Sequence, residues 1–135
     1  MRTETKKVLV IEDDSGYRNI LVVIINQLGY RVAQAEPGRD GVETAINDCF
    51  DLIFVGLDYP YLKGIDAIVR FRNNSKTKHL PILVYPKWES DWITKLALSV
   101  GATEVLEEPF TVDVICAALH RHAPLDEALF GIIAA

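Results

Sequence analysis

The stretch Asp51-Leu-Ile-Phe-Val-Gly-Leu-Asp58-Tyr-Pro60-Tyr-Leu-Lys-Gly64 decides the fold of this chain. It begins with an apolar run, residues 52–55, that has the length and β-rich composition of a buried strand. The run is predicted to break at Gly56 into a loop, and a helix pattern follows from Gly64 to Arg72. Open α/β sheets place their chemistry where such strands end. We therefore expect a functional site in the loop that follows Gly56.

Four further strand-then-helix units surround this stretch. Strands are predicted at residues 7–11, 31–35, 80–85 and 103–106, and the helices that follow them at about 15–28, 37–46, 89–100 and from 111 onward. Alternation of this kind requires a parallel sheet with helices on both faces, and right-handed crossovers make it doubly wound. The predicted fold class is therefore α/β, with a five-stranded parallel sheet.

The first helix has the clearest boundaries in the sequence. Ile20, Ile24 and Leu28 recur at helical spacing, which predicts one apolar stripe. Asp14 or Ser15 can accept hydrogen bonds from the free N–H groups at the start of the helix. A glycine follows Leu28 and is expected to end it.

Length and composition exclude several classes of protein. The 135 residues suit one domain, and 50% of them are hydrophobic, so disorder is not expected. The net charge of −5 disfavours direct nucleic-acid binding. No apolar run approaches the roughly 18 residues of a membrane span, and no signal-peptide core is present, which predicts a soluble, cytoplasmic protein. We divide the chain into a domain at 1–122 and an apolar tail at 123–135, which is expected to cap the domain, pair with another copy or begin a linker.

The chain resembles the response-regulator receiver domain from residue 7 to about residue 121. The resemblance rests on the acidic turn Glu12-Asp13, Pro60, Gly64, Pro81, Gly101-Ala102 and Pro109-Phe110. It implies a flavodoxin-like sheet of strand order 2-1-3-4-5 and a role in two-component or phosphorelay signal transduction.

The same resemblance implies that the phosphorylation site is degenerate. The acidic pair that helps to hold Mg²⁺ in the family is matched here by Glu12 and Asp13. The acceptor aspartate corresponds to Gly56, and the Thr or Ser that ends the fourth strand corresponds to Pro86. The Lys before the Pro-Phe pair corresponds to Glu108, and the switch aromatic corresponds to Val105. Glycine cannot form an acyl phosphate, and without the lysine no cation offsets the charge of a transferred phosphoryl group. We therefore expect a pseudo-receiver, not an enzyme, that acts through contacts with a signalling partner or an output domain.

Two other functions remain open. A functional receiver phosphorylated at Asp58, two residues past the acceptor position, is one alternative. A purely structural or dimerising module is the other. A cofactor-binding enzyme is disfavoured, because an acidic turn and not a Gly-rich loop follows the first strand.

No cofactor is expected, and a Mg²⁺ site is a weak alternative. Glu12, Asp13 and Asp58, with Glu108 as a further candidate, would give an oxygen-rich cluster that suits a divalent cation. Against this, Lys87 or Lys63 would neutralise the same carboxylates.

Trp88 and Trp92 lie four residues apart and share a helix face. They either cover the edge of the core or form a partner surface, since aromatic residues are enriched in interface hot spots. The resemblance implies partner docking or homodimer formation on the face made by the helix at 89–100, the strand at 103–106 and the last helix.

Overall fold

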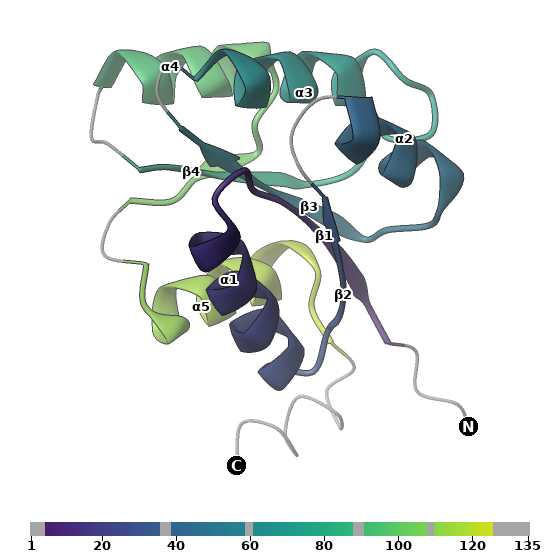
Figure 1. Ribbon diagram of the computed structural model, residues 1–135, viewed down its shortest axis with the longest axis vertical. Coiled ribbons are helices and arrows are strands. Elements are labelled where there is room, and N and C mark those ends of the chain that lie inside the picture. Colours follow the sequence, from purple (N-terminus) through teal and green to yellow (C-terminus); the bar gives the residue numbers. More distant parts are fainter. Residues whose placement is uncertain (1–4, 36–38, 59–60, 88–90, 108–109, 126–135) are drawn as a thin grey trace.

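The computed structural model describes residues 5–35, 39–58, 61–87, 91–107 and 110–125. Its five strands are β1 Lys7–Ile11, β2 Arg31–Ala35, β3 Leu52–Leu57, β4 Ile82–Pro86 and β5 Glu104–Val105. Its five helices are α1 Ser15–Gln27, α2 Arg39–Asn47, α3 Leu62–Arg72, α4 Asp91–Val100 and α5 Val112–His122. All strand pairs are parallel, and the order β2-β1-β3-β4-β5 confirms the predicted fold (Figure 1).

The sheet separates two apolar clusters. Helices α2, α3 and α4 cover one face and helices α1 and α5 cover the other (Figure 1). Every residue of β3 and β4 is buried, as expected for central strands of a sheet covered on both faces. The core therefore fixes the strands, and the carboxyl ends of β1, β3 and β4 are held at one edge.

Two predicted strand boundaries were wrong. Strand β3 does not break at Gly56, because Gly56 and Leu57 stay in register with Tyr85 and Pro86 of β4. Strand β4 begins at Ile82 and includes Pro86, which the sequence placed just outside it. The N–H of Lys87 donates to the carbonyl of Leu57 and continues the ladder past the proline.

Helix α1 starts as predicted, and its buried side is centred next to the predicted stripe. The Asp14 carboxylate accepts from the N–H of Tyr17 and caps the helix, and Gly29 follows it with φ 98°. Leu21 and Ile25 are the buried residues, whereas Ile20 is 61% exposed. Ile24 and Leu28 of the predicted stripe are half-buried and pack against the same cluster, so only Ile20 of the three faces solvent.

Helix α3 begins at Leu62, two residues before the predicted start at Gly64. Tyr61 precedes it in the left-handed conformation, with φ 75°. Gly64 itself is a close-approach position, because a Cβ there would overlap the side chain of Leu57. The glycine lets the first turn of α3 rest on the end of β3.

The chain after α5 stays on the α1–α5 side of the sheet. Ala123 and Leu125 are buried in that cluster, and the Tyr30 hydroxyl donates to the carbonyl of Ala123 at 2.8 Å. Residues 126–135 of the predicted tail lie outside the described residues. Among the helices described, none has both the length and the apolar character needed to cross a membrane.

Candidate functional site

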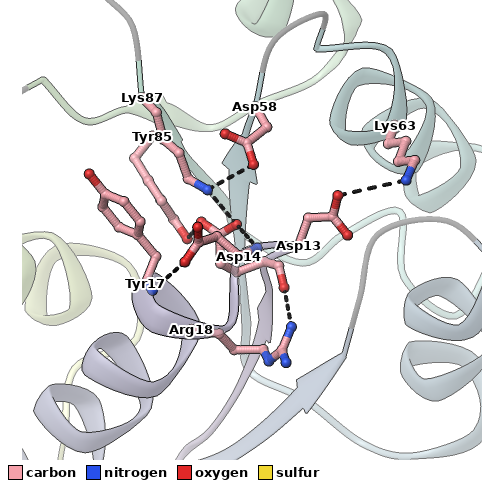
Figure 2. Close-up of polar contacts among 9 residues, drawn as sticks. Asp13, Asp14, Tyr17, Arg18, Asp58, Lys63, Tyr85 and Lys87 are labelled. Atoms are coloured by element: carbon pink, nitrogen blue, oxygen red, sulfur yellow. Dashed lines mark hydrogen bonds and ion pairs between the residues drawn. The ribbon is translucent and has the colours of Figure 1, made fainter.

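Charged residues gather at the carboxyl ends of three neighbouring strands. Glu12 and Asp13 follow β1, Asp58 follows β3 and Lys87 follows β4. Because parallel strands end at one edge, these side chains meet there, and Figure 2 shows Lys87 extended toward Asp58 and the Asp13–Asp14 turn.

Glu12 is the buried acid at the centre of this site, with a side chain only 1% exposed. Its Oε1 accepts from the Tyr85 hydroxyl at 2.7 Å. Its Oε2 accepts from Lys87 Nζ at 2.7 Å and from the N–H of Asp14 at 2.9 Å. Both oxygens are therefore engaged, and the buried charge is compensated by a cation and two further donors.

Gly56, which the resemblance aligns with the acceptor aspartate, lies under these groups in β3. A Cβ on Gly56 would lie 2.7 Å from the Tyr85 hydroxyl oxygen and 2.9 Å from Tyr85 Cζ, and would overlap Glu12 Oε1. Such separations are shorter than van der Waals contact. The space of a side chain at position 56 is thus taken by Tyr85 and Glu12.

Lys87 supplies the cation of the site. Its Nζ lies 2.7 Å from Glu12 Oε2 and 3.0 Å from Asp58 Oδ2, and its side chain is only 7% exposed. It also lies over the Tyr17 ring, 4.7 Å from the centroid. Burial alone would lower the pKa of Lys87, but the hydrogen bonds to Glu12 and Asp58 outweigh burial, and the pKa is raised. The lysine is therefore held in its charged form.

Tyr85 belongs to this candidate site, although the sequence did not assign it there. Its ring is buried between Phe54 and Phe110, with centroids 5.6 and 5.4 Å away. Burial and the neighbouring Glu12 carboxylate raise its pKa, so the hydroxyl stays protonated and donates. A glycine inside a strand pattern signals close approach of another group, and that signal at Gly56 pointed to a bulky neighbour without naming it.

The acidic turn is tied to both sides of the site. Asp13 pairs with Lys63 at 3.6 Å, and both side chains are largely exposed, so this pair is weak (Figure 2). Arg18 Nη1 donates to the carbonyl of Glu12 at 2.7 Å. The hydrogen bond from Tyr17 lowers the pKa of Asp14. Of the two lysines expected near the carboxylates, Lys87 makes the closer contacts.

The remaining predicted positions fall into three groups. Pro86 is buried at the end of β4, and Val105 is half-buried and pairs with Val84. Trp92 is 58% exposed, with its ring edge-on to Tyr61 at 5.6 Å. Four predicted positions lie outside the described residues: Pro60, Trp88, Glu108 and Pro109.

The geometry of the carboxylates does not suit a divalent cation. Both oxygens of Glu12 already accept hydrogen bonds, Oε1 from Tyr85 and Oε2 from Lys87 and a backbone N–H. Lys87 Nζ lies between the Glu12 and Asp58 carboxylates, where a shared metal ion would have to bind. Within the described ranges, no group of three or more His, Cys, Asp or Glu side chains is arranged to hold a metal. The residues present therefore do not fit the Mg²⁺ that the family resemblance implies.

Known proteins resemble this chain over most of its length. A family model described as the response regulator receiver domain matches residues 8–120. A probable transcriptional regulatory protein of Picosynechococcus sp. is 31% identical over 127 residues, which cover 85% of this chain and 49% of that protein. A probable chemotaxis protein CheY of Rhizobium etli is 27% identical over 131 residues, which cover 96% of each chain. This chain thus spans about half of the first relative and nearly all of the second.

A solved structure gives the same result for the fold. Chemotaxis protein CheY4 of Vibrio cholerae, crystallised at low pH, superposes with a TM-score of 0.80 at 28% identity, covering 88% of this chain and 99% of that one. The residues that the family model matches include the strand ends described above and all of the βα core except the first residue of β1 and the last two of α5. The chain belongs to the response regulator receiver domain family.

Proposed function

We propose that this domain is a receiver-type module of two-component signalling that is not phosphorylated, because Gly56 stands at the acceptor position, and that it acts through protein–protein contacts. The family match supports the signalling role, since receiver domains interact with signalling partners or output domains. On this proposal the domain is a binding module and not an enzyme.

One observation carries this proposal. The volume that an acceptor side chain would fill is occupied by the Tyr85 hydroxyl and the Glu12 carboxylate, which are hydrogen-bonded to each other. Gly56 offers no oxygen to phosphorylate, and Pro86 offers no hydroxyl or N–H to a phosphoryl oxygen. The site is thus filled by groups that satisfy one another.

Acetyl phosphate tests the proposal directly. We expect no phosphoryl adduct in the intact mass of the protein after incubation with acetyl phosphate and Mg²⁺. A receiver that keeps an aspartate at this position serves as the positive control in the same buffer. An acid-labile adduct on this protein would contradict the proposal.

Phosphorylation of Asp58 is the second candidate, and a specific contact favours it. Asp58 is 42% exposed and lies 3.0 Å from Lys87 Nζ, so it pairs with a lysine as a phospho-acceptor would. Repeating the acetyl phosphate assay with Asp58→Asn separates the candidates. An adduct on the wild-type protein that disappears in Asp58→Asn would favour Asp58, and an adduct that persists would place it elsewhere.

The partner surface is proposed to include α4. Trp92 keeps more than half of its surface exposed although it is an aromatic residue, a type enriched in interfaces. Homodimer formation through the α4–β5–α5 face is one form of this proposal, and a structural or dimerising module is another. Sedimentation of the wild-type protein and of Trp92→Ala distinguishes a dimer that uses this face, because only such a dimer dissociates on substitution.

A further inference from the structure

We propose that the Lys87 ammonium takes the place of the divalent cation of a receiver site, so that the wild-type pocket excludes Mg²⁺ and keeps one charge state at any Mg²⁺ concentration. This inference deepens the proposed function and rests on its premise that the pocket handles no phosphoryl group. It assigns to a side chain of the protein a role that a dissociable ion plays elsewhere in the family.

The position of Lys87 Nζ is the first argument. It bridges a buried carboxylate, Glu12, and a half-exposed one, Asp58, at 2.7 and 3.0 Å. A Mg²⁺ ion requires oxygen ligands at about 2.0–2.1 Å. An ion at the bridging position would overlap the ammonium, so the two cations compete for one volume.

The lone pairs of Glu12 are the second argument. Its Oε1 accepts from Tyr85 and its Oε2 from Lys87 and the N–H of Asp14. These bonds use three of the carboxylate's roughly four acceptor sites and both of those on Oε2, so an ion that bridges Glu12 Oε2 and Asp58 would have to displace Lys87 or the Asp14 N–H inside a buried site, where an unpaired donor is costly. The Lys63–Asp13 pair, at 3.6 Å and exposed, provides no comparable barrier.

The balance of charge is the third argument. With Lys87 present, the two carboxylates that it bridges share one cation that cannot dissociate. Without Lys87, the buried Glu12 and its neighbour Asp58 would face each other uncompensated. Carboxylates in that arrangement recruit a hydrated Mg²⁺ or Mn²⁺ ion, which needs only one or two protein carboxylates and keeps several waters.

The bridge also joins the ends of three strands. Lys87 immediately follows β4, Glu12 follows β1 and Asp58 follows β3. A metal ion would hold these ends together only while bound, whereas a lysine side chain holds them permanently. The state of the pocket therefore depends on the fold and not on the supply of metal.

Thermal denaturation with and without metal tests this inference. The wild-type melting temperature is expected to be the same in EDTA and in about 10 mM Mg²⁺ or Mn²⁺. Lys87→Met is expected to melt lower in EDTA and to rise by roughly 5 °C when the metal concentration is about ten times its Kd. Lys87→Arg keeps the cation and should behave like the wild type.

Lys63→Met is the matched control, because it removes a nearby lysine that does not bridge Glu12 and Asp58. It is expected to show no metal response. If Lys87→Met does not fold, Lys87→Gln, which keeps a hydrogen-bond donor, is measured in its place with the same expected rise. Calorimetric titration with Mn²⁺ supplies the second readout, with heat of binding only in the variants that lack the cation.

Two results would overturn the inference. One is a metal-dependent rise in the wild-type melting temperature. The other is a charge-removing variant that folds and remains indifferent to Mn²⁺. Both results are independent of the acetyl phosphate assay. A phosphoryl adduct on the wild-type protein would contradict the proposed function, whereas a metal-dependent rise in its melting temperature would contradict the claim that Lys87 replaces the ion.

Discussion

Gly56 and Tyr85 are paired across β3 and β4, and the tyrosine hydroxyl occupies the space beside the glycine. The absence of a side chain at position 56 is therefore a packing requirement. Tyr85 needs that space to reach Glu12, and Glu12 needs the Tyr85 hydroxyl because it is fully buried.

Gly56→Ala is expected to destabilise the protein by about 1–3 kcal/mol, because the added Cβ would overpack a filled site. The reason is the close approach of Tyr85 and Glu12 to that position. Urea denaturation followed by circular dichroism measures the loss.

A double-mutant cycle provides the control for this prediction. Tyr85→Leu removes the hydroxyl and Cζ that would contact the new Cβ, so Gly56→Ala should cost less in that background. Equal costs in the two backgrounds would show that Tyr85 does not fill the space beside Gly56.

Arg72 joins the end of α3 to two segments that flank β4 and β5. Its Nε donates to the carbonyl of Gly101, and its Nη1 donates to the carbonyls of Lys78 and Leu80, at 2.6 to 2.9 Å. Charge-assisted bonds to carbonyls are stronger than neutral ones. The α3–α4 side of the sheet is thus held by one side chain as well as by its apolar core.

Arg72→Met is expected to cost about 2–4 kcal/mol in free energy of unfolding, since three carbonyls lose a charged donor. Arg70→Met is the matched control on the same helix. Within the part of the chain that the structure describes, Arg70 forms a 4.0 Å surface pair with Asp66, so its loss should cost less than about 0.5 kcal/mol. Similar losses of stability in the two variants would show that the hydrogen bonds of Arg72 to these carbonyls do not stabilise the fold.

Elements were easier to predict than the site. Apolar runs separated by Gly, Pro and capping residues gave the order of strands and helices, because each is a local signal. The end of β3 was placed wrongly, since a strand buried on both faces shows no alternation to mark its end. Tyr85 was not assigned to the site because its contact with Glu12 joins residues 73 apart in the sequence.

At the scale of the whole molecule, three buried or partly buried groups among the described residues hold their protons more tightly than in the unfolded chain. Burial raises the pKa of Tyr30 to about 12, and the pKa values of Tyr85 and Lys87 are also raised. For a group with a raised pKa, the stabilisation is complete below the unfolded pKa and is lost as the pH rises toward the folded pKa.

Stability is therefore expected to fall above about pH 10, where tyrosine and lysine of the unfolded chain begin to lose protons. Each fully coupled group contributes up to about 1.4 kcal/mol per pH unit in that window. Denaturation midpoints at pH 8 and pH 11 measure the fall. Tyr30→Phe and Tyr85→Phe should each make it shallower, and an unchanged fall in both variants would contradict the assignment.

A crystal structure of the protein grown with Mg²⁺ and beryllofluoride tests most directly whether this receiver site is closed to phosphoryl chemistry. We expect Lys87 Nζ to remain between Glu12 and Asp58, with the Tyr85 hydroxyl beside Gly56 and no beryllofluoride on any carboxylate. Beryllofluoride bonded to Asp58, with Mg²⁺ on Glu12 or Asp13, would contradict that expectation.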